Sequence, residues 1–291
     1  MDRKISTLAE TRCQVGESLV WDAGQERLLW ADIPAGIIYC HDTRRGGLTR
    51  WQLPEAVGSF GVADDGRLVV ALLSGIYLFS PESQELEFLV DPELEQTKKQ
   101  PRNRLNDGKV GPDGAFWVGS IHVDAPTGTL FRVTADGRAE RKVEGLATSN
   151  GLAFSADGRT LFHSDSRQQW IDRYDLDPVT GNIANRVRIA TPSEADGRPD
   201  GGATDMEGAY WSAGVSAGCL NRYSRDGQLL ERIAVPPKAP TMPCFGGMDM
   251  RTLFFTSLRP QDAGPDCGNV FMMRVEVPGV PTSLFRTAGG K

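Results

Sequence analysis

The chain has 291 residues, a formal net charge of −6 and only three histidines. Phosphate binding needs a clustered positive surface, so a nucleic-acid partner is not expected for this acidic chain. No run of about 18 apolar residues is present, so no membrane-spanning helix is predicted. The five cysteines form no Cys-x-x-Cys pair, and no apolar signal segment follows Met1, so we expect buried free thiols in a cytoplasmic protein.

Six turns rich in Asp and Gly recur along the chain, and each leads directly into a short apolar or aromatic stretch. Their reference positions are Gly24, Gly66, Gly114, Gly158, Gly208 and Arg251. The intervals of roughly 42 to 50 residues are typical of four-stranded propeller blades. Segments with alternating polarity between the turns, such as Gly128–Val133 and Trp170–Leu176, predict strands. We therefore predict an all-β fold, a six-bladed β-propeller with four-stranded antiparallel blades, in which residues 1–291 form a single domain.

The predicted ring must close, because an open sheet edge invites pairing with other chains. Closure requires the first strand to pair with the last blade, and residues 4–11 and 283–288 are the candidates for this pairing. In a propeller the blades converge on a central channel, where ligands bind. The candidate chemistry should therefore lie in that channel.

One motif suggests a different chemistry. Gly214-Val215-Ser216-Ala217-Gly218 matches the nucleophile elbow of serine hydrolases. That elbow needs an acid and then a histidine later in the chain, whereas His41, His122 and His163 all precede Ser216. We expect the segment to be a glycine-rich bend between two propeller strands.

Four polar side chains stand at a similar distance before the turn of their blade. Asn106, Asn150 and Asp200 lie eight residues before it, and Glu17 lies seven residues before it. Equivalent positions in successive blades face the same axis, so these side chains should converge in the channel, at blade boundaries rather than inside strands. Asn and Asp are common turn residues, but Glu17 is not. Carboxylate and carboxamide oxygens suit a hard divalent cation such as Ca²⁺, Mg²⁺ or Mn²⁺.

Over nearly its whole length the chain resembles the gluconolactonase family that includes regucalcin, also called the senescence-marker-protein family. The resemblance rests on an ordered set of short motifs, each of which is weak by itself. They are Gly16-Glu17-Ser18, Arg104-Leu105-Asn106-Asp107-Gly108-Lys109, Ser149-Asn150-Gly151-Leu152, Pro199-Asp200-Gly201, Asp205-Met206-Glu207-Gly208-Ala209-Tyr210-Trp211 and Pro243-Cys244-Phe245-Gly246-Gly247.

Members of that family are six-bladed propellers that hydrolyse sugar lactones with one divalent metal in the channel. The resemblance implies that Glu17, Asn150 and Asp200 are the metal ligands. It also implies that Arg104 and Asn106 bind the ring or carbonyl oxygens of the substrate. The cation could be Ca²⁺, Mn²⁺, Zn²⁺, Mg²⁺ or Fe²⁺, because a site with few protein ligands leaves its geometry open.

A further acidic substrate contact of some relatives falls near His122, Val123 and Asp124. His122 and Asp124 are the candidates for this contact, and Val123 occupies one of the possible positions. The resemblance therefore leaves open which sugar lactone is the substrate. The oligomeric state is not indicated by the sequence.

The implied reaction is the opening of an aldonolactone, a small-molecule sugar lactone, to the sugar acid. A metal-activated water would attack, and Asp200 would take its proton as the general base, ionised at neutral pH beside the cation. One alternative keeps the propeller and the metal but acts on another ester or an organophosphate. A second alternative is a non-catalytic calcium-binding propeller.

Overall fold

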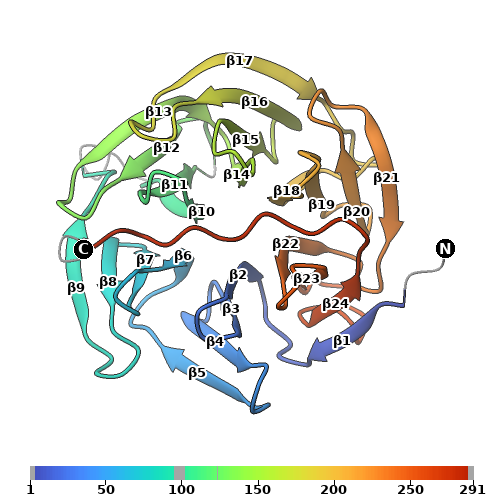
Figure 1. The fold of residues 1–291 in the computed structure, drawn as a ribbon, viewed down its shortest axis with the longest axis horizontal. Coiled ribbons are helices and arrows are strands. Elements are labelled where there is room, and N and C mark those ends of the chain that lie inside the picture. Colours follow the sequence, from blue (N-terminus) through green and yellow to red (C-terminus); the bar gives the residue numbers. More distant parts are fainter. Residues whose placement is uncertain (1–3, 95–101, 123, 288–291) are drawn as a thin grey trace.

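A computed structural model describes residues 4–94, 102–122 and 124–287. In this part of the chain, six four-stranded antiparallel sheets are arranged as blades around a central axis (Figure 1). The predicted all-β, six-bladed propeller is confirmed. No described segment forms a helix with the length and apolar composition that crossing a membrane requires.

The first three blades are continuous in sequence. Blade 1 contains β2 (Gly16–Asp22), β3 (Arg27–Asp32), β4 (Ile37–Asp42) and β5 (Leu48–Gln52). Blade 2 contains β6 (Val57–Val62), β7 (Leu68–Leu72), β8 (Gly75–Phe79) and β9 (Leu86–Val90). Blade 3 contains β10 (Arg104–Val110), β11 (Phe116–Ile121), β12 (Gly128–Val133) and β13 (Ala139–Leu146).

The remaining blades follow the same plan, except that the last one borrows a strand from the N-terminus. Blade 4 contains β14 (Ser149–Phe154), β15 (Thr160–Asp165), β16 (Trp170–Leu176) and β17 (Ile183–Ala190). Blade 5 contains β18 (Pro199–Thr204), β19 (Tyr210–Gly214), β20 (Cys219–Tyr223) and β21 (Leu229–Ala234). Blade 6 contains β22 (Pro240–Gly246), β23 (Thr252–Ser257), β24 (Val270–Arg274) and β1 (Ser6–Ala9).

The first strand of each blade lines the channel. These six strands, β2, β6, β10, β14, β18 and β22, contact one another in a ring. Each predicted Asp/Gly turn joins the first strand of a blade to the second, so all six turns lie at the same end of the channel. Asp-Gly sequences favour such hairpin turns because Gly adopts the positive φ that they need, as Gly66 does with φ 89°.

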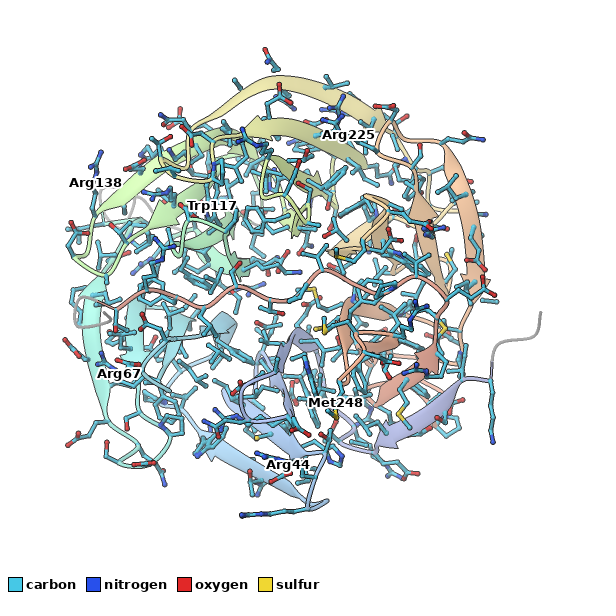
Figure 2. The ribbon with its side chains drawn as sticks, in the orientation of Figure 1. Arg44, Arg67, Trp117, Arg138, Arg225 and Met248 are labelled. Atoms are coloured by element: carbon cyan, nitrogen blue, oxygen red, sulfur yellow. The ribbon has the colours of Figure 1, made fainter. Side chains whose placement is uncertain are left out.

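The hydrophobic core is divided among the spaces between blades. Six clusters of buried apolar side chains each join two neighbouring blades around the ring. Trp117 of blade 3, for example, is fully buried and lies edge-on to Phe154 of blade 4, with ring centroids 6.0 Å apart. Figure 2 shows Trp117 within the ring and Arg138 at its outer rim. The five cysteines are buried and free, as predicted.

The N-terminal strand closes the ring, but its partner differs from the one predicted. β1 pairs antiparallel with β24, and Ser6 lies opposite Met272. The expected partner, residues 283–288, is described up to residue 287 and does not pair with β1. Its described part runs beside blade 2, where Ala63 and Phe285 form a parallel bridge. β24 already occupies the position beside β1, so the C-terminal segment is free to make other contacts.

Residues 275–287, here called the C-terminal strap, cross the ring from blade 6 to blade 2 (Figure 1). Strap backbone N–H groups donate hydrogen bonds to the turn ends of four blades. The acceptors are the carbonyl oxygens of Met250, Thr204, Val62 and Gly114, at 2.8 to 3.0 Å. The strap therefore covers the end of the channel at which the Asp/Gly turns lie.

Phe285 anchors the strap, because its fully buried ring belongs to the cluster between blades 2 and 3. We expect Phe285→Ala to lower the free energy of unfolding by about 3–5 kcal/mol, the usual range when a buried Phe leaves a cavity. Leu284→Ala is the matched control, because Leu284 is 47% exposed and should cost less than about 0.5 kcal/mol. Denaturant unfolding of both variants measures the difference, and equal stabilities would show that the strap is not anchored through Phe285.

Candidate functional site

A cavity of about 350 Å³ lies in the channel at the end away from the strap. The first strands of four blades bring five predicted site residues to its wall. They are Glu17 on β2, Arg104 and Asn106 on β10, Asn150 on β14 and Asp200 on β18. The wall also has apolar side chains, namely Val15, Ile33, Pro34, Ala56 and Ile121.

The site residues lie inside the first strands, so the prediction that they occupy blade boundaries outside the strands is wrong. At each site position the pairing of the first strand with the second slips. The slip lies between Glu17 and Val20 in blade 1 and between Asn150 and Ala153 in blade 4. Such β-bulges bend a strand and redirect side chains, and they are common beside active sites. The periodicity of the sequence does not reveal them.

The bulges of blades 1 and 4 share a backbone feature. The residue after the predicted ligand has a positive φ, 52° at Ser18 and 66° at Gly151. Gly151 has no room for a side chain, because a Cβ there would collide with the hydroxyls of Ser164 and Tyr210. Tyr210 also donates a hydrogen bond to the Gly151 carbonyl at 2.9 Å. Blade 5 thus fixes the backbone that carries Asn150.

Hydrogen bonds join four of the predicted site residues into a chain. Arg104 Nη2 donates to Asn106 Oδ1 at 3.1 Å, and Asn106 Nδ2 donates to Asn150 Oδ1 at 3.2 Å. Asn150 Nδ2 in turn donates to Asp200 Oδ1 at 2.7 Å. The predicted substrate-binding and metal-binding residues are therefore in direct contact through their side chains.

Asp107 is a further site residue, to which the sequence reasoning gave no role. Neighbouring residues of a regular strand point to opposite faces, so Asn106 and Asp107 should diverge. The register slip of β10 between Leu105 and Gly108 instead lets both line the cavity. Asp107 Oδ2 accepts a hydrogen bond from the Leu152 amide at 3.1 Å, two residues beyond Asn150. The only signal in the sequence was its place in the Arg104–Lys109 motif.

His122 and Asp124 do not line the cavity. They lie in the loop after Ile121, which does line it. His122 Nδ1 accepts hydrogen bonds from the backbone amides of Asp124 and Ala125, both at 3.1 Å. Val123 lies outside the described residues. The substrate contacts predicted for His122 and Asp124 stay a prediction.

The carboxylates of the cavity fit a cation. Glu17 Oε1 and Asp107 Oδ1 are buried and accept no hydrogen bond from the described residues. Burial first, and then the charges of Asp200 and Asp107, raise the pKa of Glu17 well above its usual value. Burial, with a further contribution from Asp107, raises the pKa of Asp200 to about 8. The low pKa expected for Asp200 therefore requires a bound positive charge, which a divalent cation would supply.

The described residues contain no group of three or more His, Cys, Asp or Glu side chains that could hold a metal ion by themselves. The predicted ligand set has only two such side chains, Glu17 and Asp200. Its third member is the carboxamide of Asn150. The donor set is thus all oxygen, as a hard cation prefers.

The raised carboxyl pKa values predict how pH affects the chelator-treated protein. The folded state holds the Asp200 proton more tightly than the unfolded state, in which the pKa is about 3.9. Stability should therefore fall as pH rises from about 4 towards 8. We expect the melting temperature to drop by several degrees between pH 5.5 and 8.5, and to drop less in Asp200→Asn. A divalent cation should remove most of the dependence, and an equal pH slope in both proteins would contradict the assignment.

The serine-hydrolase motif is a structural turn, as predicted. Val215 to Gly218 connect β19 to β20. Ser216 Oγ donates to the Glu194 carbonyl at 2.7 Å and accepts the Arg198 amide at 2.8 Å. The hydroxyl therefore donates one hydrogen bond and accepts another, and both hold the loop that precedes β18.

Comparison with known proteins identifies the family of the chain. Residues 15–259 match the family model described as the SMP-30/Gluconolactonase/LRE-like region. The chain is 39% identical to 6-deoxy-6-sulfogluconolactonase of Pseudomonas putida, over 98% of this chain and 99% of the relative. It is 28% identical to a pentonolactonase of Haloferax volcanii, over 87% and 84% of the two chains.

A solved structure has nearly the same fold. The crystal structure of a calcium-binding protein, regucalcin, from Agrobacterium tumefaciens superimposes with a TM-score of 0.89 at 27% identity. The superposition covers 98% of this chain and 97% of regucalcin. The protein therefore belongs to the SMP-30/gluconolactonase family of six-bladed propellers.

Proposed function

We propose that the protein is a sugar lactonase that depends on one divalent cation and opens an aldonolactone to the free sugar acid. The observation that supports it best is the single cavity in which Glu17, Asn150 and Asp200 meet Arg104 and Asn106. The similarity to 6-deoxy-6-sulfogluconolactonase and to a pentonolactonase supports the same substrate class. The buried free thiols favour a reducing compartment, and we propose the cytoplasm.

Glu17, Asn150 and Asp200 would hold the cation. Bound there, a divalent cation would polarise the lactone carbonyl or lower the pKa of a water. Among the described residues that line the cavity, Arg104 has the only cationic side chain. Its guanidinium would donate hydrogen bonds to substrate oxygens and hold the ester in place for attack. Asn106 keeps that guanidinium in position, because its Oδ1 accepts the bond from Arg104 Nη2.

Asp200 would act as the general base. Its carboxylate takes a proton from the attacking water while the water oxygen bonds to the carbonyl carbon. The ring C–O bond then breaks, and the proton passes to the departing ring oxygen, which becomes a hydroxyl group of the sugar acid.

One assay separates this proposal from its alternatives. Chelator-stripped protein is incubated with gluconolactone, 6-deoxy-6-sulfogluconolactone, an arabinonolactone and a phosphotriester, with and without Mn²⁺ or Ca²⁺. Acid release is measured after correction for spontaneous hydrolysis. Metal-dependent opening of a sugar lactone supports the proposal. Turnover of the phosphotriester alone would favour an organophosphate hydrolase, and cation binding without any turnover would favour a calcium-binding propeller.

A further inference from the structure

Lys109 makes a contact across the hub of the ring. It lies on β10 of blade 3, two residues after Asp107, and its Nζ donates a hydrogen bond to the Gly202 carbonyl at 2.6 Å. Gly202 belongs to β18 of blade 5. The bond therefore joins two blades that are not neighbours, and it passes in front of the first strand of blade 4.

The acceptor ends the bulge that carries Asp200. The pairing of β18 with β19 slips between Pro199 and Gly202, and Asp200 lies within this slip. Blade 6 and the second strand of blade 5 confine the same backbone from other sides, because a Cβ at Gly201 would collide with Met242 and one at Gly202 with Tyr210. The Lys109 ammonium completes this support from inside the channel.

A lysine is a costly residue for this place if it only fills space. Removing an ammonium group from water costs free energy that one bond to a neutral carbonyl and the attraction of Asp107 offset only in part. Lys109 also lines a second cavity of about 180 Å³ below the strap. An apolar side chain of similar length could fill the hub without this cost, but it could not hold the Gly202 carbonyl.

We propose that Lys109 is a positioning residue that fixes the bulge of β18 and thereby the orientation of the Asp200 carboxylate. The inference rests on the proposed function, because it concerns the same metal site. It also accounts for the arrangement of β10, in which Asp107 and Lys109 support the bulges of two neighbouring blades. Asp107 binds the backbone of blade 4 at Leu152, and Lys109 binds that of blade 5 at Gly202.

Lys109→Met tests this role, because methionine keeps most of the volume but has no N–H donor. We expect a loss of about 10- to 100-fold in Mn²⁺ affinity, measured by titration calorimetry, as is typical when a residue that orients a metal ligand is replaced. At saturating Mn²⁺, kcat should fall by a similar factor with little change in KM. The electron paramagnetic resonance spectrum of bound Mn²⁺ should also differ from that of the wild type.

Lys109→Arg should restore most of the affinity and the spectrum, since the guanidinium can donate to the same carbonyl. Lys142→Met is the matched control. Lys142 lies in β13, the outer strand of the same blade, where no cavity residue lies. Its side chain is 8% exposed and pairs with Glu140 at 2.7 Å. It should leave Mn²⁺ binding unchanged. Should Lys109→Met not fold, the neutral and shorter Lys109→Gln replaces it, with the same expected losses.

Two failures can be told apart. A wild-type protein that binds no divalent cation would overturn the proposed function itself. A wild type that binds Mn²⁺, together with Lys109→Met that binds it with equal affinity and an identical spectrum, would overturn only the role of Lys109. Wild-type Mn²⁺ affinity in Lys109→Met together with weaker binding in Lys109→Arg would likewise show that Lys109 serves packing alone.

Discussion

Asp200→Asn is expected to lower kcat for lactone opening by about 10³-fold, within the range that a general base contributes. The carboxamide has nearly the same shape as the carboxylate. It can still accept the hydrogen bond that Asn150 Nδ2 donates to Asp200 Oδ1 in the wild type. It cannot take a proton from water, and it brings no negative charge to the cation. The measurement is the steady-state rate at saturating Mn²⁺, corrected for spontaneous hydrolysis.

Asp196→Asn is the control for this variant. Asp196 lies four residues before Asp200, in the connection that precedes β18, but its carboxylate is exposed and pairs with Arg232 at 3.1 Å. Its replacement should leave kcat unchanged. Full activity in Asp200→Asn would refute the general-base role. Loss of activity in Ser216→Ala would reinstate the nucleophile elbow, although Ser216 Oγ is engaged in loop hydrogen bonds.

Glu17→Gln is expected to have two effects of opposite sign. Affinity for a divalent cation should fall by more than about 100-fold, because a direct ligand matters more than a residue that orients one. The metal-free protein, however, should melt at a higher temperature near pH 8, because one of three crowded carboxyl groups is removed. Calorimetric titration and thermal unfolding with and without Mn²⁺ measure both effects.

Glu87→Gln serves as the comparison for Glu17→Gln. Its carboxylate is 66% exposed and pairs with Arg67 on blade 2. We expect neither metal affinity nor the melting temperature of the chelated protein to change measurably, since exposed ion pairs contribute little. If Glu17→Gln binds Mn²⁺ as tightly as this control, Glu17 is not a ligand.

The placement of Glu17, Asn106, Asn150 and Asp200 in one cavity could be anticipated because the blade repeat carries positional information. Residues at the same offset in successive blades occupy the same height in the channel, whatever the distance between them in the chain. Asp107 shows the limit of this reasoning. It reaches the cavity only because β10 slips its register, and a bulge depends on the partner strand rather than on local residue type.

The elements that local chemistry controls could be predicted from the residues alone. The Asp/Gly turns, the strands that follow them, and the alternating strands β12 and β16 were predictable because turn residues and alternating polarity act over a few neighbours. Only the tertiary structure decided that β24, not residues 283–288, receives β1, that the strap crosses the ring, and that Lys109 meets Gly202. These contacts join residues far apart in the chain, so their partners are chosen by how the blades pack around the axis.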